Sequence, residues 1–280
     1  MARATSPTVR RRELGALLQR HREAVGLSVT EAAARLGCHP SKISRMESGQ
    51  RAAGTADVRK LSEIYSIDDK IRDRLVALAR EARQHGWWQD YDLESPAFVG
   101  LEAAASRLSN FESSIIPGLL QTPDYTTAVV RATHPEWPAT QVEQTVEARA
   151  IRQTRARENS VELWAILDEA VLHRAIGGAA VMAGQLDQLL LAAAEPNVVV
   201  QVIPFKAGAH LALSSTFVLI DFDQSVPSVV FVEGLVGYIY LEKDPDLARY
   251  RKALDHLRAI ASSPADSLDL VASVRNRHRS

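Results

Sequence analysis

The sequence predicts an all-α N-terminal domain of five helices, residues 1–84, followed by an α+β C-terminal domain with a mixed sheet, residues 85–280. The length of 280 residues exceeds the ~100–200 residues of a typical single domain. Apolar residues recur at helical spacing in the first part, whereas short runs of Val, Ile, Phe and Tyr begin only after residue 160. Charge divides in the same way. Residues 1–84 carry 17 Lys and Arg against 10 Asp and Glu, and the remainder carry 16 against 24.

Composition excludes several classes of protein. Apolar residues make up 46% and charged residues 24%, which is typical of a globular chain and too apolar for a disordered one. No apolar run approaches the ~18–20 residues that span a bilayer, and the Arg-rich segment Met1–Leu14 lacks the apolar core of a signal peptide. The single cysteine, Cys38, excludes an intramolecular disulfide and a multi-cysteine metal site. We therefore expect a cytoplasmic, nucleoid-associated protein without membrane contact, cofactor or metal.

Local start and stop signals define the five N-terminal helices. The first ends near Gly26, and Ser28 with Glu31 forms a capping box for the second, which ends at Gly37. Pro40 opens the third helix, which turns its apolar side chains inward. The expected ranges of the last three are Ser41–Ser48, a helix capped by Thr55, and Asp68–Gln84.

The second and third helices, joined by a tight turn that contains glycine, have the geometry of a helix-turn-helix. The outer face of the third helix carries Ser41, Lys42, Ser44 and Arg45. A major groove accepts such a face, because Arg pairs bidentately with guanine, Ser with several base edges and Lys with phosphate. The start of the second helix offers Ser28 and free backbone N–H groups to a phosphate. The pattern favours DNA binding over the alternative, a five-helix bundle that binds protein.

Residues 14–51 read LGALLQRHREAVGLSVTEAAARLGCHPSKISRMESGQR and resemble the Cro/phage-repressor (Xre-type) helix-turn-helix family. The resemblance includes the turn, an I-S-R-[IM]-E run and a closing G-x-R. It implies that Ser41, Ser44 and Arg45 face bases, that Ser28, Lys42, Ser48, Gln50 and Arg51 lie near phosphates, and that Arg22 and Glu47 form a structural ion pair. His39 and Cys38 depart from the usual Ser or Thr and Val. Because one short helix reads few base pairs, we also expect a homodimer.

The C-terminal domain reads as helices followed by strands. The expected helices are Pro96–Glu112, Pro123–His134, Ala139–Asn159, Ala170–Ile176, Ala180–Ala194, Pro245–Ser262 and Pro264–Arg279. The expected strands are Val161–Leu167, Val198–Pro204, Thr216–Phe222, Ser228–Glu233 and Gly237–Glu242. The helices between the first two strands permit a parallel crossover, and the short turns between the last three predict antiparallel pairing.

Four segments of this domain carry a second resemblance. They read IPGLLQTPDY, LDEAVLHRAIGG, VQVIPFKAGAH and VVFVEGLVGYIYLE, and together with the M-x-x-Q-L pattern of Met182–Leu186 they resemble the C-terminal domain of actinomycete Xre-type regulators, a group that includes WhiJ-like and AbaA-type regulators. The resemblance implies a domain without established enzymatic activity. It also implies regulation through a ligand or a small BldB-like partner protein.

An enzyme remains an alternative only if Asp168, Glu169, His173, His210 or Glu233 converge in one cleft. Against it, the sequence has no HExxH, Walker A, GxSxG or GxGxxG pattern, so we expect no catalytic residues. A further feature is a basic concentration on one long helix, which is either a solvated face braced by Glu143 and Glu147 or a site for an anionic ligand or acidic partner. Its members are Arg149, Arg152, Arg155 and Arg157.

These observations predict a sequence-specific DNA-binding transcriptional regulator. Residues 40–48 read the major groove of double-stranded DNA, and the C-terminal domain dimerises and senses a partner or ligand. The alternative is an antitoxin-like interaction protein that neutralises a small partner and regulates its own operon.

Overall fold

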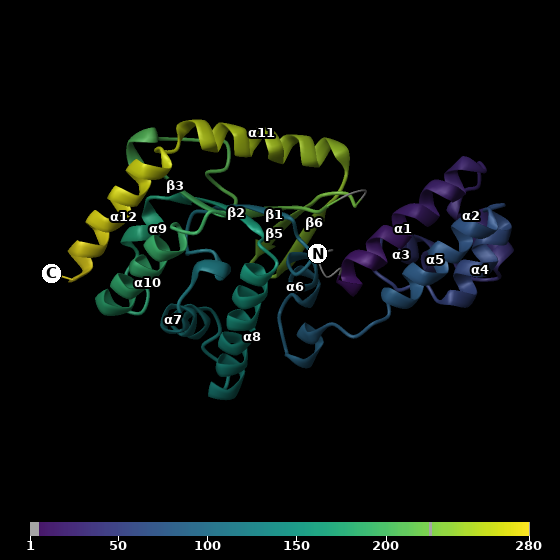
Figure 1. Ribbon diagram of the computed structural model, residues 1–280, viewed down its shortest axis with the longest axis horizontal. Helices are drawn as coiled ribbons and strands as arrows, with labels where there is room; N and C mark the ends of the chain where they lie inside the picture. The colour runs from purple at the N-terminus through teal and green to yellow at the C-terminus, as the bar shows by residue number, and fades with distance from the viewer. Residues whose placement is uncertain (1–5, 224–225, 280) are drawn as a thin grey trace. The chain divides into compact units, whose positions relative to one another are not determined.

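The computed structural model describes residues 6–223 and 226–279, which form two compact units (Figure 1). Among the described residues, the first unit holds the chain through Asp90 together with Pro96–Ala104 and residues 226–227. The second unit holds Tyr91–Ser95, Ala105–Asp223 and the chain from Ser228 onward.

The first unit is helical, as the sequence predicts. Its described helices are α1 (Pro7–Ala24), α2 (Val29–Leu36), α3 (Pro40–Glu47), α4 (Thr55–Ile64), α5 (Asp69–Glu81), the 3₁₀ helix η1 (Trp87–Asp90) and α6 (Pro96–Glu102). Leu18, Ile43 and Val58 come from three of these helices and are fully buried in one core. The Oγ of Ser6 caps α1 and donates to the carbonyl of Gly100, so α6 packs against the start of α1.

The start and stop signals predicted for the N-terminal helices are present, with small differences in the helix ends. Both hydrogen bonds of the Ser28–Glu31 capping box are present, and Gly37 ends α2 with a φ of 73°. The predicted cap at Thr55 is wrong by one residue, because Gly54 is the N-cap and Thr55 is already helical. The fifth helix ends at Glu81 rather than at Gln84.

In the described part of the second unit, six strands form one mixed sheet in the order β3-β2-β1-β4-β5-β6. The strands are β1 (Arg107–Glu112), β2 (Glu162–Asp168), β3 (Val198–Ile203), β4 (Phe217–Asp221), β5 (Val229–Gly234) and β6 (Gly237–Leu241). The first three strands are parallel, and β4, β5 and β6 are added antiparallel to them and to each other. The predicted mixed sheet is confirmed, and so is the crossover between the two parallel strands β2 and β3.

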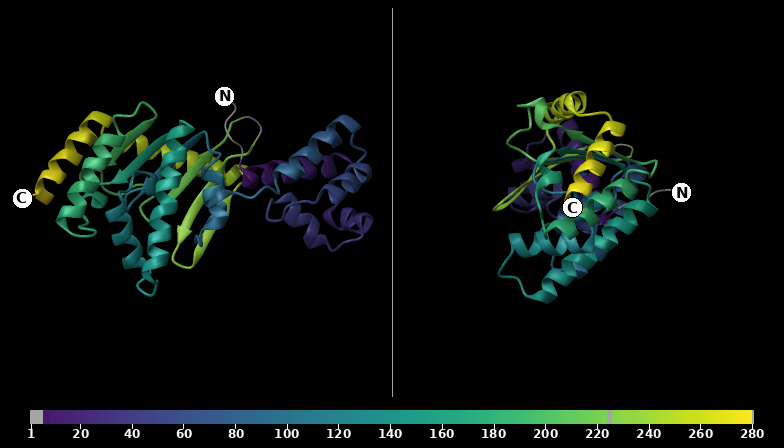
Figure 2. Two further views of the ribbon diagram at one scale, coloured as in Figure 1. Left: turned by 60° about the horizontal axis from the view of Figure 1, so that its bottom comes forward. Right: turned by 90° about the vertical axis from the view of Figure 1, so that its left-hand side faces the viewer.

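Helices cover both faces of this sheet. Those described are η2 (Gly118–Leu120), α7 (Pro123–Thr133), α8 (Ala139–Glu158), α9 (Ala170–His173), α10 (Ala179–Ala192), η3 (Phe205–Ala207), α11 (Asp244–Ile260) and α12 (Pro264–Arg279). The apolar side of α11, with Leu254 and Leu257, packs on Phe111, Ile166 and Val230 of the strands. Figures 1 and 2 show α11 on the opposite side of the sheet from α7 and α8.

The predicted helix Pro96–Glu112 is wrong in its second half. Helix α6 ends at Glu102, and Arg107–Glu112 is β1, which lies between β2 and β4 in the sheet. Two features of the sequence hide this strand. Leu108 and Phe111 are three residues apart, as on a helix face, and the two residues between them are polar although they are buried. Ser109 is accommodated there because Arg258 of α11 donates to its hydroxyl over 3.1 Å.

Candidate nucleic-acid interface

Helix α3 divides into a buried and an exposed side. Ile43 and Met46 point into the core, with 0% and 2% of their surface exposed. Ser44 and Arg45 are exposed, and Ser41 is partly buried near the start of the helix. The three residues expected to face bases therefore lie on the side of α3 that is turned away from the core.

The unusual His39 has a local structural role. Its ring Nδ1 accepts a hydrogen bond from the backbone N–H of Ser41 over 3.2 Å and lies 2.9 Å from the Ser41 hydroxyl oxygen. An imidazole thus caps α3 in place of the Ser or Thr hydroxyl that usually does so. Arg45 Nε donates to the Ser41 carbonyl over 3.1 Å, so the exposed guanidinium lies back along its own helix.

The start of α2 is already occupied by a carboxylate. Glu31 Oε2 accepts from the Ser28 backbone N–H over 2.8 Å and from the Ser28 hydroxyl over 2.7 Å. These hydrogen bonds lower the pKa of Glu31, because they stabilise its ionised form. A phosphate at this helix end would lie beside a negative charge and would find the Ser28 hydroxyl engaged.

Lys42 also has an intramolecular partner. Its ammonium nitrogen lies 2.8 Å from Asp57 Oδ1 on α4, which joins α3 to the next helix. Gln50 and Arg51 are exposed on the turn that follows α3, and the Arg51 N–H anchors that turn by donating to the Arg45 carbonyl over 2.9 Å. Ser48 is exposed as well, so three of the five residues expected near phosphates lie together after α3.

A buried ion pair holds α3 from behind. Arg22 of α1 donates to both carboxylate oxygens of Glu47, over 2.7 and 2.9 Å, and its third contact is the carbonyl of Leu27 at 2.7 Å. The side chains of Arg22 and Glu47 are only 9% and 8% exposed. The hydrogen bond to Glu47 raises the pKa of Arg22. One guanidinium therefore links α1, the turn between α1 and α2, and the end of α3.

Gly15 is the residue of this region that sequence reasoning missed. A Cβ atom at Gly15 would lie 2.4 Å from the carbonyl oxygen of Glu47 and 2.6 Å from that of Met46. Helix α1 therefore crosses the end of α3 at a distance that only glycine permits. The available signal was a glycine inside an amphipathic helix, which costs helix stability and calls for a packing reason.

Four of the five residues considered for catalysis form two pairs beside the end of β2, and Glu233 lies apart from them. Asp168 Oδ1 caps the start of α9 by accepting from the Ala170 N–H over 2.9 Å, and Asp168 Oδ2 lies 3.8 Å from His210 Nε2. Glu169 lies 3.3 Å from His173 and accepts the backbone N–H of residue 205. Glu233 is on β5, away from these pairs in the sheet order. Among the described residues, no group of three or more His, Cys, Asp or Glu is arranged to hold a metal ion.

The basic residues of α8 also separate. Arg149 donates to the Gln121 side chain and, over 3.5 Å, to the Thr126 hydroxyl, while Gln153 of the same helix donates to the carbonyls of Gly118 and Gln121. This part of α8 therefore holds the loop that precedes α7. Arg155 and Arg157 are exposed near the end of the helix, and Arg152 is partly buried.

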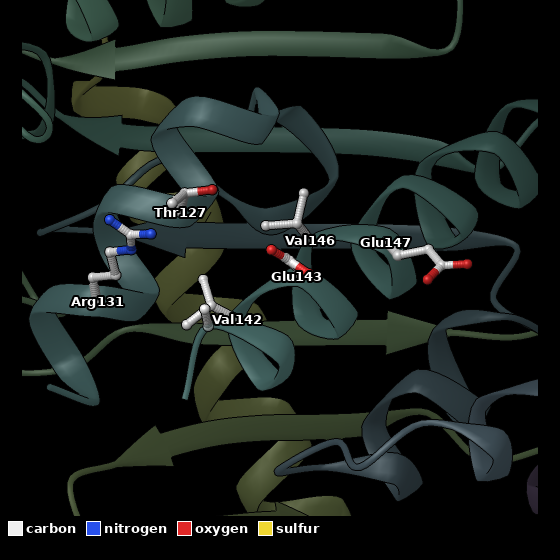
Figure 3. A pocket seen from close by; sticks show the side chains of 7 residues that line it. Thr127, Arg131, Val142, Glu143, Val146 and Glu147 are labelled. Atoms are coloured by element: carbon white, nitrogen blue, oxygen red, sulfur yellow. The ribbon is translucent and has the colours of Figure 1, made fainter. Parts of the chain in front are cut away.

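An open recess of about 390 Å³ lies between α7 and α8 (Figure 3). Its lining mixes apolar and charged side chains: Thr127, Arg131, Ala139, Val142, Glu143, Val146 and Glu147. Glu147 also accepts a hydrogen bond from Tyr91 over 3.1 Å. The recess brings together two carboxylates and one guanidinium, and the hydroxyl of Thr127 in its lining donates to the Pro123 carbonyl over 2.9 Å.

Comparison with known families identifies both parts of the chain. Residues 13–75 match the family described as "Helix-turn-helix domain", and residues 95–273 match "Domain of unknown function (DUF5753)". No curated protein and no solved structure is significantly similar to the chain. None of the described helices is both long and apolar enough to cross a membrane. The chain thus carries a helix-turn-helix domain, which is a DNA-binding module of regulators.

Proposed function

We propose that this chain, which belongs to the family of the domain of unknown function DUF5753, is a sequence-specific DNA-binding transcriptional regulator of the Xre type. The observation that carries the proposal is the construction of α3. Its outer side exposes Ser44 and Arg45, while Gly15 and the Arg22–Glu47 ion pair fix its other side against α1. A short polar helix held rigidly in this way suits the major groove.

In this proposal Arg45 reads a guanine and the two serines of α3 contact neighbouring base edges. To do so, Arg45 exchanges its hydrogen bond to the Ser41 carbonyl for two bonds to a base. Ser48, Gln50 and Arg51 contact phosphates from the turn after α3. Lys42 shares its ammonium between a phosphate and Asp57, and Ser28 contributes mainly through its place at the α2 N-terminus.

The proposal includes a homodimer, in which two α3 helices enter successive turns of the major groove about 34 Å apart. The second unit supplies the contact between the two copies and senses a ligand or a small BldB-like partner protein. No catalytic role is proposed for it.

Binding of the full chain to the DNA upstream of its own gene tests the proposal. We expect a complex that survives an excess of unrelated DNA and weakens as salt rises, because phosphate contacts release counterions. Symmetry in the protected sequence would report the dimer. If an equal concentration of unrelated DNA abolishes the complex, the chain binds DNA through phosphate attraction alone. That result would contradict sequence-specific regulation.

A further inference from the structure

One face of the second unit's sheet collects polar and aromatic side chains at the end of β1. Strand pairing sets Asn110 opposite Val218, Val218 opposite Phe231, and Phe231 opposite Tyr240, so these residues form a row across four strands. Side chains two residues apart share a face of a strand. This face is opposite to the one that packs on α11, whose strand residues include Phe111 and Val230.

A second row runs beside the first on the same face. It contains Glu112, the last residue of β1, and Glu233 of β5, which pairs with Tyr238 of β6. The ring of Phe231 stacks on Tyr238 at 5.6 Å between centroids and contacts Tyr240 at 5.3 Å. The Tyr240 hydroxyl is fixed by Ser95 at 2.8 Å. The carboxyl groups of Glu112 and Glu233 therefore lie beside a surface formed by three aromatic rings.

Glu112 lies in surroundings that disfavour its negative charge. Desolvation, followed by repulsion from Glu233, raises the pKa of Glu112 to about 8. Desolvation and Glu94 likewise raise the pKa of Glu233. The positive groups Arg149, Arg152 and His134 act on Glu233 and lower its pKa, whereas the hydrogen bond that favours ionised Glu112 comes from Asn110.

Asn110 supplies a second observation, a buried oxygen atom that lacks a hydrogen-bond donor among the described residues. Its side chain belongs to a residue only 7% exposed, and its Oδ1 has no hydrogen-bond partner among the described residues. A buried carbonyl oxygen without a partner is costly, so such groups are rare in folded proteins. Asn110 precedes Glu112 by two positions on β1, so its side chain lies on the same sheet face as the carboxyl groups. An N–H donor bound at this place would satisfy it.

We propose that this face binds a small organic cation, an amidinium, guanidinium or primary amine carried on a flat apolar group. The cationic N–H groups would donate to Glu112, Glu233 and Asn110 Oδ1, and the flat group would lie on the rings of Tyr238 and Tyr240. Aromatic ring faces attract cations, so the tyrosine rings can contact the cationic group of the ligand as well as its flat group. The site lies at the carboxyl end of β1, where the parallel half of the sheet meets the antiparallel half, a common position for ligand sites. That the cation acts as an effector rests on the proposed regulatory function; its binding does not.

Calorimetric titration of the full chain without DNA tests this site. The probes are benzamidine, phenylguanidine and phenethylamine, with benzyl alcohol as the uncharged control. At pH 8 we expect saturable binding of at least one cationic probe and none of benzyl alcohol. Glu112→Gln should weaken that binding at least tenfold and Tyr238→Leu should weaken it as well. Glu158→Gln, a change of an exposed glutamate at the end of α8, should leave it unchanged.

The titration also has a proton readout. Because a bound cation favours ionised Glu112, binding near pH 7 should release a proton, which appears as a binding heat that depends on the buffer. The groups that act on Glu112 in this balance are Glu233 of β5 and Tyr125 of α7. Glu94, His134, Arg149 and Arg152 act on Glu233, and Arg149 and Arg174 act on Tyr125. Absence of saturable binding for all three cations, or equal affinity in a folded Glu112→Gln protein, would overturn the site. Neither result would contradict the proposed DNA binding, which is measured in a separate experiment.

Discussion

Replacing Gly15 by alanine tests how tightly α1 is packed against α3. The new Cβ would lie 2.4 Å from the Glu47 carbonyl oxygen, whereas real Cβ atoms stay beyond 3.0 Å of such atoms, so the helices must separate by at least about 0.6 Å. Forcing a methyl group into a packed interface costs ~1–3 kcal/mol. Alanine recovers up to ~1 kcal/mol of that through its helix propensity. Because the shift also disturbs the Arg22–Glu47 hydrogen bonds, we expect a net destabilisation of the first unit by about 1–2 kcal/mol.

A denaturant titration measures the change in stability, and hydrogen exchange of the amides in α1 and α3 assigns that change to the first unit. Gly184→Ala is the matched control, because Gly184 lies inside α10 and a Cβ there meets nothing within 4 Å. Gly184→Ala should stabilise the second unit by ~0.5–1 kcal/mol. If Gly15→Ala is as stable as the parent chain and exchanges no faster in α3, the close approach inferred here is wrong.

Three further changes probe charge in both units. Glu47→Ala leaves Arg22 buried without its carboxylate and should destabilise the first unit by ~3 kcal/mol or more, measured by thermal unfolding; a loss under ~1 kcal/mol would show that the pair does not hold α3. Asp57→Asn releases Lys42, so DNA affinity should rise and the plot of log affinity against log salt should steepen by about 0.9, the value for one added phosphate contact; an unchanged slope would remove Lys42 from the phosphate contacts. Glu112 binds its proton more tightly in the folded chain than in the unfolded one, so its contribution to stability falls as pH rises from about 5 to 8. Glu112→Gln should therefore match the parent chain near pH 5 and exceed it by ~3–4 kcal/mol at pH 8, and a constant difference across that range would contradict the raised pKa.

The first unit could be predicted closely because its boundaries depend on nearby residues. The Ser28–Glu31 capping box, the left-handed Gly37 and the first-turn Pro40 act within a few positions of themselves. The contacts that sequence reasoning missed join distant parts of the chain. Lys42 and Asp57 meet only because α3 and α4 pack together, and a sequence pattern that places Lys42 outward does not reveal that partner.

The second unit was predicted well in class and less well in detail. Strand β1 was missed because Ser109 and Asn110 are buried polar residues, and their burial depends on partners far along the chain. The same dependence hid the cation site. Glu112 and Glu233 are 121 positions apart and come together through the register of β1, β4 and β5, which no local pattern specifies.

Base reading by Arg45 of α3 can be measured as the difference in affinity between two DNAs. Affinities of the full chain for its upstream site and for unrelated DNA are compared for the parent, Arg45→Ala and Arg80→Ala, an exposed arginine on α5 that serves as the matched control. We expect Arg45→Ala to lose ~1–3 kcal/mol of discrimination between the two DNAs, and Arg80→Ala to retain it. Full discrimination in a folded Arg45→Ala protein would contradict base reading by this helix.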